Sequence, residues 1–145
     1  MIVLENINKS YGNLHVLKNV SATINKKEIL CIEGPSGAGK TTLLKIIGKL
    51  EHMDSGKIIF NGKELNNLSG NKLCEFRNQK IGFVFQFHHL MPEFTVLENI
   101  CMPAFINKKK DESKKYAYQL MESLNIYHKK NNFPEELSGG EQQRV

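Results

Sequence analysis

The sequence predicts an α/β fold with an antiparallel β-subdomain at its start and a helical subdomain at its end. Three observations lead to this prediction. Two segments of alternating apolar residues, 2–7 and 16–24, are typical of paired strands. The apolar run Ile29–Ile32 leads through a glycine-rich loop into a segment with helical spacing. Beyond residue 95, apolar residues recur mainly at helical spacing. Together these segments form an α/β pattern.

The first half of the chain is divided by turn signals. Tyr11-Gly12 separates the two opening strands, which we expect to pair antiparallel. Apolar residues within 43–50 fall on one face of a helix that follows the glycine-rich loop. Residues 57–60 predict a further strand, and Asn61-Gly62 after it is a hairpin signal. The mixed segment 65–79 contains a short predicted helix.

The second half contains one predicted strand and two predicted helices. The β-branched and aromatic run Ile81–Phe85 predicts a buried strand. Thr95 is placed to cap a helix over Val96–Phe105, with Glu98 completing a capping box. A longer helix is predicted over 111–125, because four apolar residues share one of its faces: Ala117, Leu120, Met121 and Leu124.

Composition and charge describe an ordinary globular domain. The 145 residues suffice for one domain with a core, and 40% are hydrophobic while 24% are charged. The net charge of +5 comes mostly from scattered lysines, which favours solvated lysines over a nucleic-acid or membrane face. The densest cluster, Lys108–Lys110, is followed at once by Asp111 and Glu112, as at a solvated helix start.

The chain shows no pattern of a secreted or membrane-spanning protein. Its first residues lack a signal-peptide pattern, and no apolar run approaches the ~20 residues that span a bilayer. The three cysteines form no CxxC pair, and Cys31 and Cys101 lie in apolar runs. We therefore expect buried free thiols in a reducing, cytosolic compartment.

The glycine-rich loop has the full pattern G-x-x-x-x-G-K-[ST] of a P-loop. It consists of Gly34, Pro35, Ser36, Gly37, Ala38, Gly39, Lys40 and Thr41. Glycines let successive backbone N–H groups converge on phosphate oxygens, next to a helix N-terminus. Lys40 would neutralise the β- and γ-phosphates, and the Thr41 hydroxyl would hold Mg²⁺. A glycine-rich turn without a ligand is the alternative, but such a turn needs no Lys-Thr pair.

Hydrolysis of a nucleoside triphosphate requires more than a P-loop. It needs an acidic residue at the end of a second apolar strand, and no such run follows the P-loop. The strand Ile81–Phe85 ends in Gln86, and the sequence stops at a predicted helix start with Ser138 as N-cap. We therefore expect residues 1–145 to be the front part of a longer domain. The 145-residue chain by itself is predicted not to hydrolyse ATP.

The segment Leu137–Val145 reads Leu-Ser-Gly-Gly-Glu-Gln-Gln-Arg-Val and resembles the signature motif of ATP-binding cassette (ABC) ATPases. The P-loop, Gln86 and this segment match three motifs of that family in the correct order, so the resemblance covers the whole chain. It implies an ABC-type fold whose C-terminal part is missing here. It divides the chain into a β-subdomain with the P-loop core at 1–85 and a helical subdomain at 86–145.

The resemblance also implies roles for individual residues in binding ATP and Mg²⁺. Tyr11 matches the aromatic residue that stacks on adenine, although a surface tyrosine in a turn is the alternative. Thr42 matches a residue that contacts the α-phosphate, and Gln86 one that approaches Mg²⁺ and the attacking water. Ser138, Gly139 and Gly140 match residues that contact the γ-phosphate on the opposite subunit. Ser138 can also serve as a plain N-cap. Lys40, Gln86 and Ser138 are thus the expected catalytic residues.

The segment Phe85–Ile100 closely resembles ATP-binding subunits of lipoprotein-releasing complexes, and Arg77–Gly82 supports this branch. The resemblance implies a homodimer on the cytoplasmic face of the inner membrane. Integral-membrane transporter subunits would be its partners, lipoprotein its indirect cargo, and nucleic acid no partner. His88-His89 is not expected to bind metal, since adjacent histidines point opposite ways on a strand and no third ligand is in view.

Other functions remain open from the sequence alone. ABC ATPases of the macrolide-export or cell-division type share most of these motifs. An ABC protein that acts on DNA or ribosomes would carry a coiled-coil insertion or a second cassette, and neither is visible. The remaining alternative is a nucleotide-binding fragment that does not hydrolyse ATP.

Overall fold

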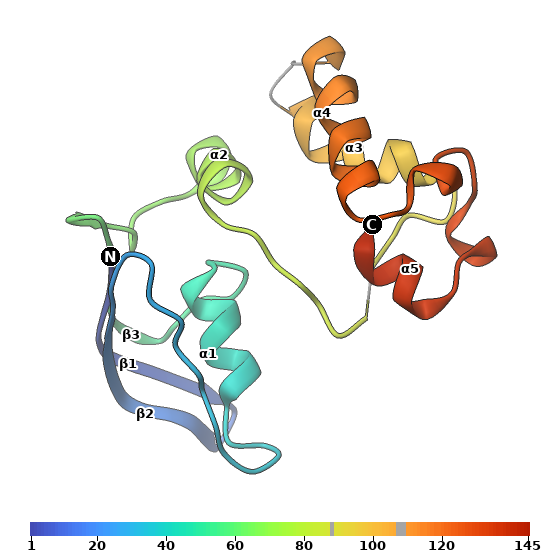
Figure 1. The fold of residues 1–145 in the computed structure, drawn as a ribbon. Helices are drawn as coiled ribbons and strands as arrows, with labels where there is room; N and C mark the ends of the chain where they lie inside the picture. The colour runs from blue at the N-terminus through green and yellow to red at the C-terminus, as the bar shows by residue number, and fades with distance from the viewer. Residues whose placement is uncertain (88, 107–109) are drawn as a thin grey trace. The chain divides into compact units, whose positions relative to one another are not determined.

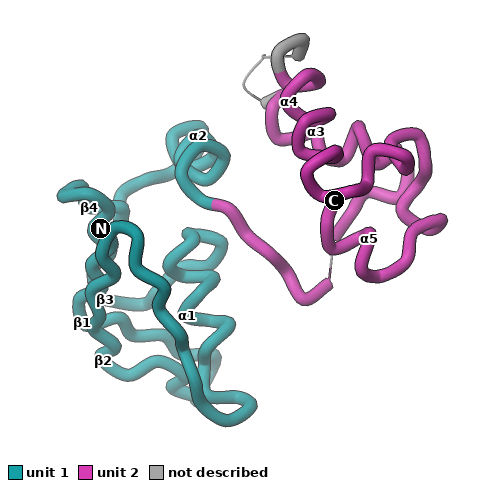
Figure 2. Tube along the Cα trace, viewed as in Figure 1, with its two compact units in different colours: residues 1–81 teal, residues 82–145 magenta. Residues whose placement is uncertain are grey.

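The computed structural model describes residues 1–87, 89–106 and 110–145. It divides into two compact units, Met1–Ile81 and Gly82–Val145 (Figure 2). His88 of the histidine pair, and Lys108 and Lys109 of the lysine cluster, lie outside the described residues. Over the described ranges, no helix is both long and apolar enough to cross a membrane.

The first unit is built on a four-stranded antiparallel sheet with strand order β2-β1-β3-β4 (Figure 1). Its strands are β1 (Ile2–Tyr11), β2 (Leu14–Ile24), β3 (Ser55–Phe60) and β4 (Lys63–Glu64). The predicted pairing of the two opening strands is confirmed, and both strands are longer than predicted. The Asn61-Gly62 hairpin is confirmed as well, since β3 and β4 pair antiparallel on either side of it.

The core of the first unit lies between this sheet and α1 (Lys40–Ile47). Leu43 and Ile46 of α1 pack with sheet residues in one buried cluster, whose other members are Leu4, Ile7, Leu17, Ile58 and Leu65. Burial of each such aliphatic side chain contributes about 1.5–3 kcal/mol to the stability of the folded state. This packing attaches α1, and therefore the loop before it, to the sheet.

A second helix, α2 (Gly70–Lys80), corresponds to the short helix predicted within 65–79. None of its side chains is fully buried. Phe76 packs edge-to-face on Phe60 of β3, with the ring centroids 5.2 Å apart. That aromatic contact joins α2 to the sheet.

Two predicted strands are absent, and both predictions are wrong. The backbone of Ile29–Ile32 and Ile81–Phe85 is irregular. Several of their apolar side chains are exposed, Ile29 to 98% and Val84 to 86%, whereas Ile32 is half-buried against the core of the first unit. A strand exists only where a neighbour completes its hydrogen-bond ladder, and no segment of the described chain pairs with either run. Cys31 is exposed with its run, so the predicted burial of that thiol is also wrong; Cys101 is buried as expected.

The second unit contains three α-helices and two 3₁₀-helices in its described part. They are α3 (Val96–Ile106), α4 (Lys110–Ser123), η1 (Tyr127–Lys129), η2 (Pro134–Glu136) and α5 (Gly139–Arg144). Their core contains Val96, Met121, Ile126 and Leu137. The last of these is the first residue of the predicted signature segment, which is therefore anchored in the core at Leu137.

The predicted helix starts and faces of the second unit are largely confirmed. The backbone N–H and the hydroxyl of Thr95 both donate to the Glu98 carboxylate at 2.8 Å, which forms the predicted capping contacts. Within α4 and the turn after it, Ala117 and Met121 are buried as predicted. Leu120 and Leu124, placed on the same face by periodicity, are 36% and 43% exposed.

Candidate nucleotide site and signature segment

The P-loop forms a cavity of about 300 Å³, at the small end of the range of about 300–1,000 Å³ typical of ligand pockets. Its lining consists of Val16, Ser36, Gly37, Ala38, Gly39, Lys40, Thr41 and Thr42. Six of the eight predicted P-loop residues therefore line one cavity, together with Thr42. Gly34 and Pro35 stand at the start of the loop and contact Lys40 through their carbonyl groups.

The ammonium group of Lys40 is held at this loop. Its Nζ donates hydrogen bonds to the carbonyl oxygens of Gly34 at 2.8 Å and Pro35 at 2.7 Å. An ammonium group has three donors, so one remains for a further acceptor. The cavity is lined mainly by small residues of the glycine-rich loop and contains a fixed positive charge. Such a cavity suits an anionic ligand, and phosphate in particular.

Gly39 shows why the loop needs glycine at its last turn. Its φ is +85°, and a Cβ atom there would lie 2.9 Å from side-chain atoms of both Val16 and Leu17. Gly37, with φ +81°, has no atom within 4 Å of the same position. The loop is thus pressed against β2 at Gly39 and open at Gly37. Val16 lines the cavity because of this contact, and sequence motifs gave no signal for it.

Mg²⁺ fits the donors of this loop as an ion held mainly by phosphate oxygens. Thr41 supplies a hydroxyl, which is a hard oxygen donor of the kind Mg²⁺ prefers. In the described part of the chain, no three His, Cys, Asp or Glu side chains are grouped to hold a metal. Mg²⁺ commonly binds through few protein ligands together with phosphates and waters, so this donor set suits an ion that arrives with a nucleotide.

Tyr11, at the end of β1, is held beside the cavity by polar contacts. Its hydroxyl donates a hydrogen bond to the Glu51 carboxylate and also bonds with the Thr42 side chain. The bond to Glu51 is the main reason that the pKa of Tyr11 is raised. The Nζ atom of Lys9 lies 5.1 Å from the centre of its ring. Lys9 and Tyr11 are two positions apart in β1, so alternation along a strand could have predicted that they lie on the same face. No local sequence pattern predicts the contact of Tyr11 with Glu51.

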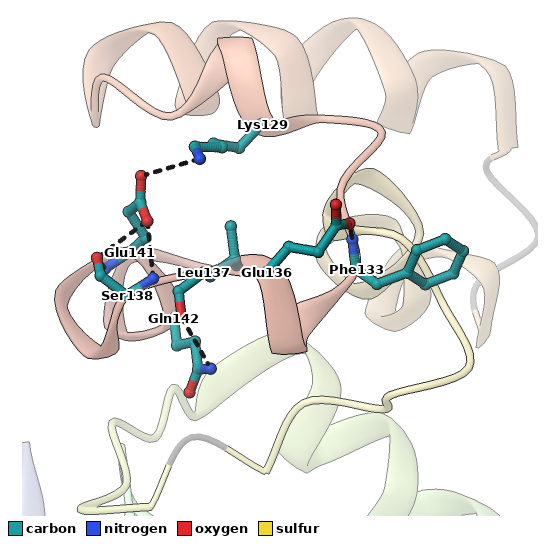
Figure 3. Close-up of polar contacts among 7 residues, drawn as sticks. All are labelled: Lys129, Phe133, Glu136, Leu137, Ser138, Glu141 and Gln142. Atoms are coloured by element: carbon teal, nitrogen blue, oxygen red, sulfur yellow. Dashed lines mark hydrogen bonds and ion pairs between the residues drawn. The ribbon is translucent and has the colours of Figure 1, made fainter.

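Gln86 and the signature residues belong to the second unit. Gln86 lies in the irregular segment after Phe85, and its side chain is exposed. Ser138 caps α5 as predicted (Figure 3). Its backbone N–H and its hydroxyl donate to Glu141 Oε2 at 2.8 and 2.9 Å, and its Oγ accepts from the Glu141 N–H at 3.4 Å.

The charge of Glu141 is stabilised where it holds Ser138. Hydrogen bonds from the Ser138 backbone and side chain lower the pKa of the Glu141 carboxyl, and the positive charges of Lys129 and Arg144 lower it further. The Nζ atom of Lys129 lies 3.7 Å from Glu141 Oε1 (Figure 3). Ser138 is therefore fixed by a carboxylate that remains ionised near neutral pH.

Side-chain contacts also fix the signature segment on its N-terminal side. The Gln142 side chain donates to the carbonyl oxygens of Pro134 at 2.8 Å and Leu137 at 3.4 Å. Leu137 is 7% exposed and lies in the core of the unit. In contrast, Gly139 and Gly140 are exposed, and a Cβ at Gly139 would meet nothing within 4 Å. The backbone of the two glycines is thus accessible to solvent, while Leu137 and Gln142 anchor the segment on either side of them.

Comparison with known proteins assigns this arrangement to a family. The model of the family "ABC transporter" matches residues 17–145. The chain is 49% identical to the lipoprotein-releasing system ATP-binding protein LolD of Bacteroides thetaiotaomicron and 47% identical to that of Porphyromonas gingivalis. Both alignments cover 100% of this chain and 67% of the relative. Over 97% of its length, the chain is also 47% identical to LolD of Buchnera aphidicola.

Solved structures agree with the sequence relatives. The dimeric structure of MJ0796, a bacterial ABC transporter cassette, matches with a TM-score of 0.90 and 37% identity. A structure of MJ0796 in a post-hydrolysis state, bound to ADP and Pi, matches equally well. Each match covers 99% of this chain and 66% of the other. The chain thus spans about two thirds of its relatives' length, and the predicted α/β fold class is confirmed. The chain belongs to the ABC transporter family, as an ATP-binding cassette sequence.

Proposed function

We propose that this chain is part of an ATPase subunit that couples ATP binding and hydrolysis to the release of lipoproteins from the inner membrane. The observation that carries the proposal is a formed phosphate cavity around Lys40 in a chain 47–49% identical to three LolD proteins. The subunit would act on the cytoplasmic face of that membrane, with integral-membrane transporter subunits as partners.

The first part of the mechanism is binding of the triphosphate. Lys40 would neutralise the β- and γ-phosphates with its free N–H donor, while the backbone N–H groups of the loop bind phosphate oxygens. The Thr42 side chain, which lines the same cavity, would contact the α-phosphate. Bound Mg²⁺, with Thr41 as its protein ligand, would neutralise charge that develops on the phosphates.

The second part is closure of the site by another copy of the chain. Ser138, Gly139 and Gly140 would contact the γ-phosphate bound in the opposite subunit, through a hydroxyl and backbone N–H groups. The exposed glycines on a fixed frame support this role, as does the dimeric state in which MJ0796 was solved. In this proposal Gln86 positions the attacking water and approaches the metal.

The finer assignment, to lipoprotein release, is tested by reconstitution. The full-length product would be purified together with the membrane subunits that bind it and inserted into proteoliposomes loaded with a lipoprotein. We expect ATP-dependent release of the lipoprotein, and none with the Lys40→Ala variant. ATPase activity without lipoprotein release would instead favour the macrolide-export or cell-division type. A product without ATP binding would contradict the proposal as a whole.

A further inference from the structure

A cluster of charged residues surrounds Tyr11 on the side of the sheet where β1 ends. The Tyr11 hydroxyl donates to the carboxylate of Glu51, which follows α1 by sequence and lies 40 residues away. The same carboxylate lies 3.6 Å from Lys9 Nζ. Lys9, Tyr11 and Glu51 therefore form one connected group made by two segments distant in the sequence.

Lys9 is held firmly within this group. Its side chain is only 14% exposed, and its Nζ is also 3.6 Å from Asp54 Oδ1. Asp54 is in turn fixed by the backbone N–H of Ser10, which donates to Oδ2 at 2.6 Å. The ammonium group lies 5.1 Å from the centre of the Tyr11 ring, within the range of a cation–π contact.

Tyr11 also contacts a residue that lines the P-loop cavity. Its hydroxyl bonds with the side chain of Thr42, which lines that cavity. The Tyr11 residue is nevertheless 45% exposed. Lys9 covers one face of the ring, so a flat ligand can stack only on the opposite face. The hydroxyl contacts prevent the ring from rotating away.

We propose that Lys9 and Glu51 are positioning residues that orient the Tyr11 ring for stacking on the base of a bound nucleotide. The inference rests on the proposed function, because it requires phosphates in the P-loop. A ring that is already oriented loses little conformational entropy when the ligand binds, and such preorganisation increases affinity.

The test compares a ligand that has a base with one that lacks it. Affinities of the full-length product for Mg-ATP and for inorganic triphosphate would be measured by calorimetry. Glu51→Ala and Lys9→Met should each weaken Mg-ATP binding, by about 3–10-fold, since a base stacked on an aromatic ring is worth roughly that or more. The affinity of either variant for inorganic triphosphate should stay within twofold of that of the unmodified protein. Lys18→Met, on the exposed face of β2, removes the same charge and should change neither affinity.

Tyr11→Phe provides a second measurement that does not depend on the charged residues. It keeps the ring but removes the hydroxyl and its bonds with Glu51 and Thr42, so it should weaken Mg-ATP binding at least as much as Glu51→Ala does. The double variant should lose less affinity than the sum of the single variants, because both substitutions break the Tyr11–Glu51 hydrogen bond. Glu51→Gln retains an acceptor for the hydroxyl and should recover part of the affinity.

Each outcome separates this inference from the proposed function. Equal weakening for both ligands, additive losses in the double variant, or unchanged Mg-ATP affinity would overturn the positioning role. If the unmodified protein bound neither ligand, the proposed function itself would fail. Selective loss of ATP affinity with triphosphate binding intact supports both.

Discussion

The Nζ atom of Lys40 lies 2.7 Å from the carbonyl oxygen of Pro35 and donates a hydrogen bond to it. The lysine is therefore folded back over the start of its own loop, and a second bond to the Gly34 carbonyl holds it there. Two of its three donors are used before any ligand arrives. The loop thus holds a cation in place, and at Gly39 it lies against Val16 and Leu17 of β2.

The contact of Gly39 with β2 predicts a large effect of an added methyl group. Gly39→Ala should lower the free energy of unfolding by about 1–3 kcal/mol from overpacking, since the new Cβ would lie 2.9 Å from side-chain atoms of Val16 and Leu17. The positive φ adds about 1–2 kcal/mol of backbone strain for alanine, so the total loss should be about 2–5 kcal/mol. Displacement of the loop should also abolish ATP binding. Urea denaturation and calorimetry measure the two effects.

Gly37→Ala is the matched control for that substitution. Its φ of +81° is nearly the same as that of Gly39, but no atom lies within 4 Å of the added Cβ. We expect a loss of about 1–2 kcal/mol from backbone strain alone. Equal destabilisation by the two variants would show that contact with β2 does not shape the loop.

Ser138→Ala should separate closure of the dimer from binding of nucleotide. The variant loses an N-cap, which typically costs about 1 kcal/mol, and it loses the hydroxyl proposed to contact the γ-phosphate. ATP affinity of the monomer should remain unchanged, while ATP-dependent dimerisation, measured by analytical ultracentrifugation, should weaken strongly.

Ser69→Ala serves as the control for Ser138→Ala. Ser69 is the N-cap of α2 but makes no side-chain capping bond, so its replacement should change neither stability nor dimerisation appreciably. If Ser138→Ala dimerised with ATP as well as the unmodified protein does, the signature segment would not be the closing element.

The lowered pKa of Glu141 predicts how the capping box responds to acid. A carboxyl whose pKa is lower in the folded state stabilises that state above its unfolded pKa, about 4.3. This stabilisation is lost as pH falls through the lower, folded-state pKa. The melting temperature of the unmodified protein should therefore exceed that of Glu141→Gln near pH 7, and the difference should shrink below about pH 4.

Lys129→Met tests the origin of that pKa. Without this ammonium group, the Glu141 carboxyl should protonate at higher pH, so the loss of stability should begin at higher pH too. Glu135→Gln, which removes an exposed carboxylate from nearby η2, should leave the pH profile unchanged. A profile unaffected by Glu141→Gln at any pH would contradict the capping role.

Local features were the ones that could be predicted from the sequence. The pattern of the P-loop lies within eight consecutive positions, and six of those residues line one cavity in the structure. The starts of α3 and α5 were predicted because a cap and its glutamate are three residues apart. These signals depend on the nearest neighbours in the chain, and tertiary packing does not alter them.

Features that depend on distant partners could not be predicted. Ile29–Ile32 has the composition of a strand, but strand formation requires a hydrogen-bonded neighbour that a periodic pattern cannot reveal. The contact between Tyr11 and Glu51 joins residues 40 positions apart. Val16 lines the P-loop cavity because β2 packs against Gly39, and no sequence motif predicts this packing.

The central claim is that Lys40 and its loop bind the phosphates of a nucleotide, and calorimetric titration with Mg-ATP tests it most directly. The unmodified full-length product should bind one ATP per chain, while Lys40→Ala should show no measurable binding and remain folded by circular dichroism. Lys45→Ala removes an exposed lysine from the last turn of the same helix and should bind ATP normally. ATP affinity unchanged by Lys40→Ala would contradict the claim.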